Sequence, residues 1–303
     1  MGANLKEVRE RIKSVISTQQ ITKAMKMVSA AKLRRAQQAI VQLRPYSEKL
    51  TKMMQNVLTA LDGNSDSVFN TTREVNNVLI VVVTSNRGLA GALNTNINKA
   101  AAQLVREKYA TQLEAGKVSF LPIGKKGREY VDRNFKKSPV NADHVNAFSD
   151  LSFLAISKIG DHIMEEFSAG TYDAIEIVYS RFKNAGVQTT IVEQFLPVKK
   201  MPFETTRKSL PDYIFEPDKE ELLADLIPTI LKIQFHKTLL DTQASEHGAR
   251  MTAMDKATEN ADNLLLELKI NYNKARQEAI TRELSEIVGG AAALGYLIIK
   301  FIV

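Results

Sequence analysis

Residues 250–288 read RMTAMDKATENADNLLLELKINYNKARQEAITRELSEIV, and they carry the strongest indication of the fold. A narrow seam with a period near 3.5 runs through them, which is typical of a helix that packs along a second helix in a left-handed supercoil. The helix is expected to start well before this stretch, because residues 229–288 contain no proline and a single glycine, Gly248. The seam consists of Met254, Ala257, Ala261, Leu264, Leu268, Tyr272, Ala275 and Ala279.

The N-terminal segment supplies a partner for that helix. Residues 3–44 contain neither glycine nor proline, and the first break is expected at Arg44-Pro45. About 60 helical residues span roughly 90 Å, whereas a globular domain of this chain would be only about 40 Å across. We therefore expect an antiparallel coiled coil that projects beyond the rest of the protein as a rod. Its N-terminal apolar positions are Leu5, Val8, Ile12 and Val15, then Ala24, Met27, Val28 and Ala31.

The middle of the chain, about residues 75–210, alternates between strand and helix patterns. Residues 77–85, NVLIVVVTS, form a β-branched apolar run that is typical of a buried parallel strand. The fold class is therefore α/β with long helices, in which the N- and C-terminal helices pair and flank an inserted Rossmann-like α/β domain. Further strands are expected at 118–123, 172–180 and 187–196, and helices at 94–109 and 148–168.

Four segments follow from these patterns: an N-terminal helix over 1–60, an α/β domain over 75–210, a C-terminal helix over 219–294 and an apolar tail over 295–303. The sequence LDGNSDS at 61–67 marks the end of the first helix. The chain ends in LGYLIIKFIV (294–303), which carries one charge, Lys300. Two outcomes stay open for the tail: a helical extension that a partner covers, or an appendage beyond a helix that ends at Gly295.

Composition limits the chemistry that the chain can perform. It has no cysteine, which excludes disulfides, thiolate catalysis and cysteine metal sites. Its four histidines lie far apart in the sequence and none belongs to an HExxH motif, so no metal site is expected. No apolar run approaches the roughly 18–20 residues that a membrane span needs, and the N-terminus has no secretory signal. Contact with a membrane is expected only through partners.

Basic residues are concentrated near the N-terminus. The net charge of the chain is +7, yet residues 1–60 alone hold twelve Lys and Arg against three Glu, so the remaining residues carry a net −2. An acidic protein surface is the favoured partner for this segment, and a solvated face is the alternative. Nucleic acid is a weaker candidate, because no homeodomain, zinc-finger or aromatic-stacking pattern accompanies the charge.

The glycine-rich turn SNRGLAGALN (85–94) follows the first expected strand, where a nucleotide would bind in a Rossmann fold. Gly88 and Gly91 do not have GxGxxG spacing, and no GxxxxGK[ST] sequence is present in the chain. The spacing therefore favours a tight turn onto the next helix over a phosphate site. No cofactor is expected.

Three stretches resemble one known family closely. They are residues 11–36 (RIKSVISTQQITKAMKMVSAAKLRRA), residues 245–254 with 272–291 (YNKARQEAITRELSEIVGGA), and residues 81–96 (VVVTSNRGLAGALNTN). These motifs are long and specific, and the chain resembles the gamma-subunit family of F-type ATP synthases from residue 3 to about 294, least closely between 105 and 200. The resemblance implies a non-catalytic rotor whose coiled coil turns inside a ring of catalytic subunits.

The resemblance also implies the partners. They are three alpha and three beta subunits, the epsilon subunit and the c-ring, without nucleic acid, and with the membrane contacted only through the c-ring. Rotation of the shaft would drive each beta subunit through its nucleotide states, on the cytoplasmic face of the bacterial inner membrane. Such a rotor needs no catalytic residue, cofactor or metal of its own.

Residue roles are carried over by motif. Arg276 and Gln277 match a polar pair that hydrogen-bonds a beta-subunit loop; being adjacent, they point about 100° apart on a helix and cannot both face an intramolecular seam. Arg250, Thr281 and Glu283 match positions tied to coupling, and Met25 and Lys26 lie where the shaft passes an acidic lever of beta. Phe215 and Glu216 match the foot that faces the c-ring. The alternatives are a basic coiled-coil structural or nucleic-acid-binding protein and, third, an enzyme that uses a phosphate.

Overall fold

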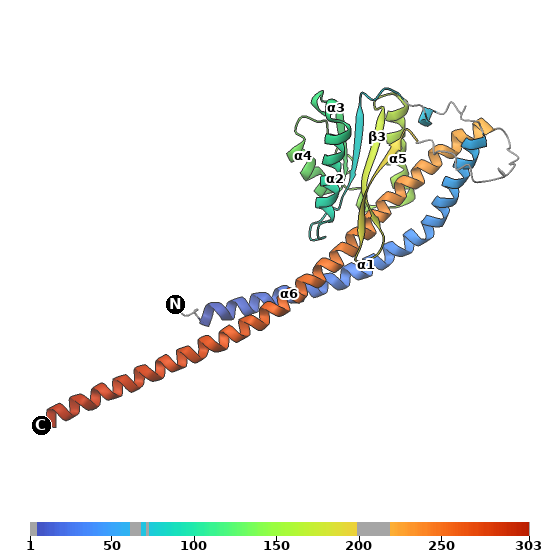
Figure 1. The fold of residues 1–303 in the computed structure, drawn as a ribbon. Helices are drawn as coiled ribbons and strands as arrows, with labels where there is room; N and C mark the ends of the chain where they lie inside the picture. Colours follow the sequence, from blue (N-terminus) through green and yellow to red (C-terminus); the bar gives the residue numbers. More distant parts are fainter. Residues whose placement is uncertain (1–4, 61–67, 71–72, 199–218, 303) are drawn as a thin grey trace. The chain divides into compact units, whose positions relative to one another are not determined.

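The computed structural model describes residues 5–60, 68–70, 73–198 and 219–302 (Figure 1). Its longest elements are helices α1 (Leu5–Ala60) and α6 (Lys219–Ile302). The chain divides into two compact units, one of residues 1–27 and 254–303 and the other of residues 28–253. Because α6 continues to Ile302, Gly295 does not end the helix.

The larger unit contains a four-stranded sheet in the order β2-β1-β3-β4. β1 (Val78–Val83) pairs in parallel with β2 (Val118–Ile123) and with β3 (Ala174–Phe182), while β4 (Gln188–Leu196) pairs antiparallel with β3. All six residues of β1 are buried, as the continuous apolar run predicts for a central parallel strand. The four strands begin and end within two residues of the predicted bounds.

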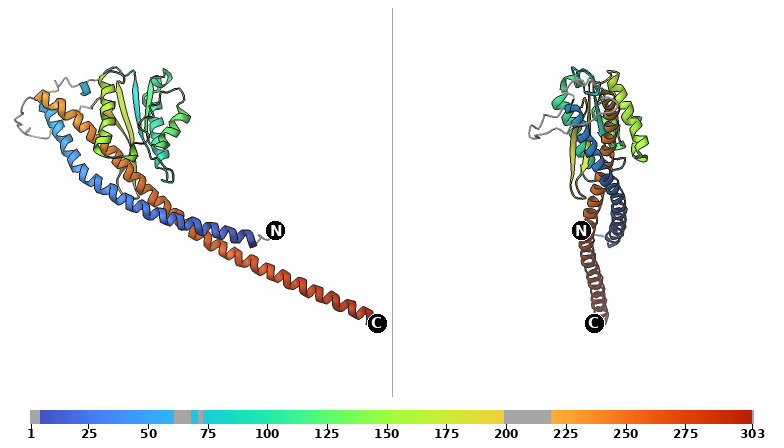
Figure 2. Two further views of the ribbon diagram at one scale, coloured as in Figure 1. Left: turned by 180° about the vertical axis from the view of Figure 1, so that it is seen from behind. Right: turned by 90° about the vertical axis from the view of Figure 1, so that its right-hand side faces the viewer.

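Helices cover both faces of this sheet (Figures 1 and 2). α2 (Leu93–Lys108) and α4 (Lys125–Asn134) pack against Val78, Ile80 and Val82, whereas α5 (Phe153–Ser168) and α6 pack against Leu79, Val81 and Val83. Alternate residues of β1 therefore serve two separate cores, because successive side chains of a strand point to opposite faces. Shorter elements are η1 (Val68–Asn70), α3 (Ala110–Glu114) and η2 (Ala147–Ser149).

Two helix predictions need correction. The helix expected from residue 148 begins at Phe153, because Ser152 accepts a hydrogen bond from the amide of Ala155 and caps it. α4 was not predicted, because its ten residues include a single aliphatic one, Val131, which is too few to mark an apolar stripe in the sequence.

The break predicted at Arg44-Pro45 is also wrong, because α1 continues through Pro45 to Ala60. A proline inside a helix removes one backbone hydrogen bond. Contacts just before the proline hold this part of α1 in place: Ile40 is buried against Leu240 and Ala244, and Arg44 is bonded to Asp241 of α6. Tertiary packing therefore overrides the local helix-breaking signal.

The buried face of α1 differs from the predicted one after Val15. Ala24, Met27, Val28 and Ala31 are exposed. Helical spacing alone identifies an apolar stripe. The side chains of this stripe are mostly small, so the stripe offers little apolar area and does not determine which face of the helix is buried. Among the described residues after Val15, α1 instead buries Thr22, Ser29, Leu33, Ala36, Ile40 and Ser47.

Candidate functional site

In the unit formed by residues 1–27 and 254–303, α1 and α6 run antiparallel and are joined by polar pairs. Seventeen residues separate Arg9 from Lys26 on α1, and seventeen separate their partners Tyr272 and Asp255 on α6, so the two helices keep one register. The pairs are Arg9 Nη2–Tyr272 OH (2.8 Å), Gln19–Asp262, Thr22 Oγ1–Thr258 Oγ1 (2.8 Å) and Lys26 Nζ–Asp255 Oδ1 (2.5 Å).

The seam predicted on α6 is confirmed. Met254, Ala261 and Leu268 are buried, and the five other seam residues are half-buried. The polar pairs lie beside this seam and were not predicted. Polar residues next to the seam on both helices are the signal that would have found them, once the register was known.

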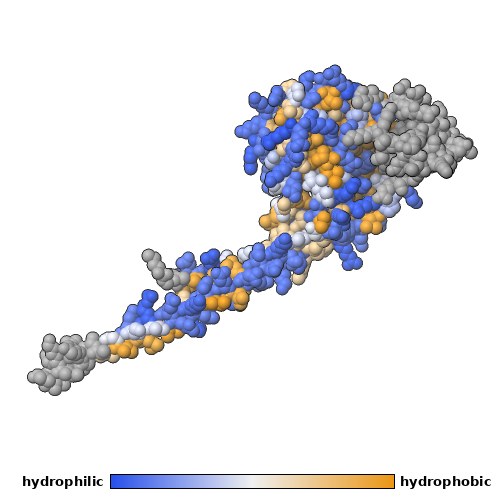
Figure 3. Space-filling model, in the orientation of Figure 1, coloured by the Kyte–Doolittle hydropathy of each residue, from blue (hydrophilic) through white to orange (hydrophobic). Residues whose placement is uncertain are grey.

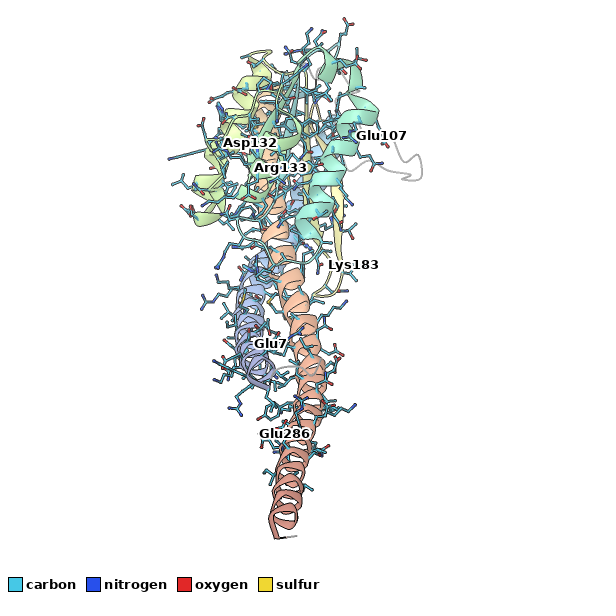
Figure 4. All side chains as sticks on the ribbon, turned by 90° about the vertical axis from the view of Figure 1, so that its left-hand side faces the viewer. Glu7, Glu107, Asp132, Arg133, Lys183 and Glu286 are labelled. Atoms are coloured by element: carbon cyan, nitrogen blue, oxygen red, sulfur yellow. The ribbon has the colours of Figure 1, made fainter. Side chains whose placement is uncertain are left out.

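α6 continues past the first described residue of α1. The register places Leu5 opposite Arg276, and every residue from Ile280 to Ala291 is exposed. In Figure 4 the side chains around Glu286 project from α6 with no second helix beside them, as far as the described residues of this unit extend. This exposed end of α6 is the candidate functional site.

Two columns of side chains run along the exposed end. Residues spaced by three and four share a helix face, so Arg276, Ile280, Glu283 and Ile287 form one column and Gln277, Thr281, Leu284 and Val288 form the next. Each column begins with a polar group that can bond a partner and ends in an exposed aliphatic residue. Figure 3 shows hydrophobic surface beside hydrophilic surface along this part of α6. Such a surface is suited to a protein partner, because it offers both directional hydrogen bonds and apolar area.

The structure brings together four of the predicted contact residues, Arg276, Gln277, Thr281 and Glu283, all exposed at this end of α6. Met25 and Lys26 are half-buried on α1 in the same unit, where Lys26 is already paired with Asp255. Arg250 belongs to the other unit and is buried. Phe215 and Glu216 lie outside the described residues.

In the larger unit, α6 fills the crevice where a Rossmann fold binds its nucleotide. That crevice lies at the carboxyl ends of neighbouring parallel strands, here β1 and β3. Ser245 Oγ donates to the carbonyl oxygen of Ser180 in β3 (3.1 Å), and Arg250 Nη2 donates to the carbonyl oxygens that follow β1. A guanidinium of the protein thus bonds main-chain atoms at the edge of the sheet where such a fold binds its ligand. Within the described segments, no cluster of three or more histidine, aspartate or glutamate side chains is placed to hold a metal ion.

His247 makes the stability of this unit depend on pH. Burial, together with the charges of Arg250 and Lys32, lowers the pKa of His247 from 6.5 to about 4. The imidazole is neutral in the folded chain, whereas the unfolded chain takes up its proton below pH 6.5. Stability from this residue is therefore complete at pH 7 and is lost as pH falls from 6.5 to about 4, by on the order of 3 kcal/mol.

Replacing His247 with Gln should remove that part of the pH dependence. We expect urea unfolding of the full-length chain to show a smaller loss of stability between pH 7 and pH 4.5 in His247→Gln than in the unmodified chain. Comparison of the two chains also separates His247 from His144 and His236, whose pKa values burial lowers as well. Equal losses in both chains would assign the acid sensitivity to other groups.

Sequence comparison identifies relatives over nearly the whole chain. A protein-family model described as ATP synthase matches residues 4–294. The chain is 53% identical to the ATP synthase gamma chain of Cytophaga hutchinsonii over 293 residues, covering 96% of this chain and 99% of that one. It is 52% identical to the ATP synthase gamma chain of Flavobacterium johnsoniae, with the same coverage.

Solved structures share the fold. A chain of the Euglena gracilis mitochondrial ATP synthase, solved as OSCP/F1/c-ring, has a TM-score of 0.67 at 23% identity, covering 96% of this chain and 94% of that one. A chain of the rotor of the same enzyme has a TM-score of 0.64 at 22% identity, covering 91% and 98%. These matches confirm the predicted fold class. In the part of the chain that the structure describes, the helices lack the length of apolar sequence needed to cross a bilayer.

Proposed function

This chain belongs to the gamma-chain family of ATP synthase, whose members are non-catalytic rotor subunits of the central stalk, and we propose that the exposed end of α6 is the surface through which it acts on the catalytic subunits. The relatives do not support the alternative of a nucleic-acid-binding or merely structural coiled coil. The observation that carries the proposal is the register of the coiled coil. Residues 280–291 of α6 lie past the position that faces Leu5, the first described residue of α1, and all of them are exposed.

In this proposal Arg276 and Gln277 hydrogen-bond a loop of a beta subunit, and Thr281 and Glu283 extend that contact toward the C-terminus. Three beta and three alpha subunits surround the shaft. The aliphatic residues Ile287 and Val288 then meet an apolar surface of the ring, which permits sliding because apolar contact is non-directional. Coupling is strongest when the polar contacts form in only one rotary state, since contacts made equally in all states favour none.

Met25 and Lys26 form a second proposed contact, with an acidic segment of beta. Lys26 forms an ion pair with Asp255, and both side chains are about half exposed. A carboxylate of another subunit can therefore approach the ammonium group from the solvent side. Exposed ion pairs contribute little, at most about 1 kcal/mol. Exchange of Asp255 for an external carboxylate therefore involves only a small change in free energy, which suits a contact that must form and break once per turn.

We further propose that Phe215 and Glu216 contact the c-ring, that the epsilon subunit binds the same central stalk, and that the complex translocates protons. The chain then lies on the cytoplasmic face of the bacterial inner membrane and reaches the bilayer only through the c-ring. The family assignment supports these placements.

The test is a double variant, Arg276→Ala with Gln277→Ala, in the reconstituted complete enzyme. A hydrogen bond to a charged group contributes roughly 1.5–3 kcal/mol, and 1.4 kcal/mol corresponds to about tenfold in rate. We expect proton-driven ATP synthesis to fall at least about tenfold, while the isolated subunit keeps its thermal stability because both side chains are exposed. Arg106→Ala, at an exposed position of α2, is the matched control and should leave synthesis unchanged. Normal synthesis in the double variant would reject the contact.

A further inference from the structure

Arg250 differs from the other predicted contact residues of α6, because its side chain is only 9% exposed. Its Nη2 atom donates to the carbonyl oxygens of Arg87 (3.3 Å) and Gly88 (3.1 Å) and lies 2.7 Å from Oε1 of Glu246, one helical turn earlier. The guanidinium thus points into the protein, toward the turn that follows β1. In this arrangement it is not available to a carboxylate of another subunit.

That turn holds an unusual backbone conformation. Leu89 has φ +61° although it is not glycine, and its side chain is 65% exposed. A branched residue in the left-handed region is strained and persists only where neighbouring contacts enforce it. The carbonyl oxygen of Arg87 accepts two hydrogen bonds, one from Ser85 Oγ (2.6 Å) and one from Arg250. Asn94 at the start of α2 accepts from the amide of Ser85 (3.0 Å) and closes the turn from the other side.

We propose that Arg250 is a positioning residue: it fixes the turn 85–91 to α6, and its influence on coupling acts through that turn instead of through direct contact with a catalytic subunit. Glu246 orients the guanidinium and balances its charge in a buried place. Lysine cannot replace arginine here, because its ammonium lacks the planar, preorganised group and ends short of both carbonyl oxygens. The coupling part of this inference rests on the proposed rotor function, whereas the clamp itself does not.

The two roles for Arg250 predict opposite effects of Glu246→Gln. If Arg250 contacted an external carboxylate, removal of the neighbouring negative charge would strengthen that contact. If Arg250 positions the turn, the same change removes the group that orients it and loosens the turn. Arg250→Lys separates the roles a second time, since it keeps the positive charge but not the reach.

The rate of trypsin cleavage measures how firmly the turn is held. Arg87 is exposed, and the peptide bond after it contains one of the two carbonyl groups that accept a hydrogen bond from Arg250. In limited digestion of the full-length chain, we expect cleavage at Arg87–Gly88 to be about tenfold faster in Arg250→Lys, as loss of one or two hydrogen bonds predicts. Glu246→Gln should change cleavage in the same direction. Cleavage after Lys183, in the turn between β3 and β4, is the internal reference (Figure 4).

Thr252→Ala is the matched control on the same helix. Thr252 Oγ1 donates to the carbonyl oxygen of Ala185 (3.0 Å), so this variant should speed cleavage after Lys183 and leave Arg87–Gly88 unchanged. Unchanged cleavage at Arg87–Gly88 in Arg250→Lys would overturn the proposed role of Arg250 in holding the turn, independently of the rotor function.

In the assembled enzyme, Arg250→Lys and Glu246→Gln should both lower ATP synthesis. Faster cleavage of the turn together with higher ATP synthesis in Glu246→Gln would overturn the positioning role. Failure of the rotor proposal would instead appear in the Arg276 and Gln277 variant.

Discussion

Gly124→Ala is expected to lower the free energy of unfolding of the larger unit by roughly 3–5 kcal/mol, from backbone strain and overpacking together. Gly124 joins β2 to α4 with φ +101°, a conformation that residues with a side chain rarely adopt. A Cβ there would lie 2.1 Å from the carbonyl oxygen of Thr84 and 2.7 Å from its carbonyl carbon. Since these are backbone atoms of the neighbouring strand end, no rotamer change relieves the clash.

Gly116→Ala provides the control for that prediction. Gly116 also has a positive φ, +71°, but nothing lies within 4 Å of the added Cβ. Gly116→Ala should therefore lower the free energy of unfolding through backbone strain alone, by about 1–2 kcal/mol. The measurement is urea unfolding of the full-length chains, followed by a signal from the α/β core. If both variants lose the same stability, the close approach of Gly124 to Thr84 does not limit this position.

Arg44→Ala is expected to destabilise the same unit by about 3–5 kcal/mol, because it leaves a buried carboxylate without its partner. Arg44 Nη2 donates to Asp241 Oδ1 (2.9 Å) and to the carbonyl oxygen of Phe182 (2.7 Å), so one side chain connects α1, α6 and the end of β3. The Asp241 side chain is only 1% exposed. Without the guanidinium, its negative charge would be both dehydrated and unpaired.

Two further variants test this explanation. Arg128→Ala removes an ion pair with Asp132 in which both side chains are half exposed, and it should change stability by less than about 1 kcal/mol. The double variant Arg44→Met with Asp241→Leu replaces the buried pair by apolar groups and should recover most of the loss. If Arg44→Ala lowers the free energy of unfolding no more than Arg128→Ala does, another group must stabilise the buried carboxylate of Asp241.

These contacts bear on the rotor function because a torque on α6 reaches the α/β domain only through groups that join them. Within the larger unit, those groups include Arg44, Asp241, Ser245 and Arg250. Most of their partners are main-chain carbonyl groups, of Ser180 and Phe182 in β3 and of Arg87 and Gly88 in the turn after β1. The carbonyl groups of Ser180 and Phe182 belong to β3 and move with the sheet. A polar connection to them is therefore stiffer than contact between side chains alone.

Elements whose signal is local could be predicted from the sequence alone. The seam of α6, the bounds of β2 and the exposure of Arg276 and Gln277 all follow from helical or strand periodicity, and the structure agrees with each. The family was also evident from sequence, because its motifs are contiguous. Periodicity works here because it depends only on the geometry of one element.

The buried face of α1, the helical conformation around Pro45 and the direction of the Arg250 side chain could not be predicted from the sequence and required the three-dimensional structure. Each depends on atoms distant in the sequence: Thr258 for Thr22, Asp241 for Arg44, and the carbonyl oxygens of Arg87 and Gly88 for Arg250. Helical spacing predicts that α1 has an apolar stripe. When two stripes are similarly hydrophobic, the residues that pack against the helix determine which of them is buried. A buried guanidinium and an exposed one look the same in sequence, because burial is a property of the surroundings that satisfy its hydrogen bonds.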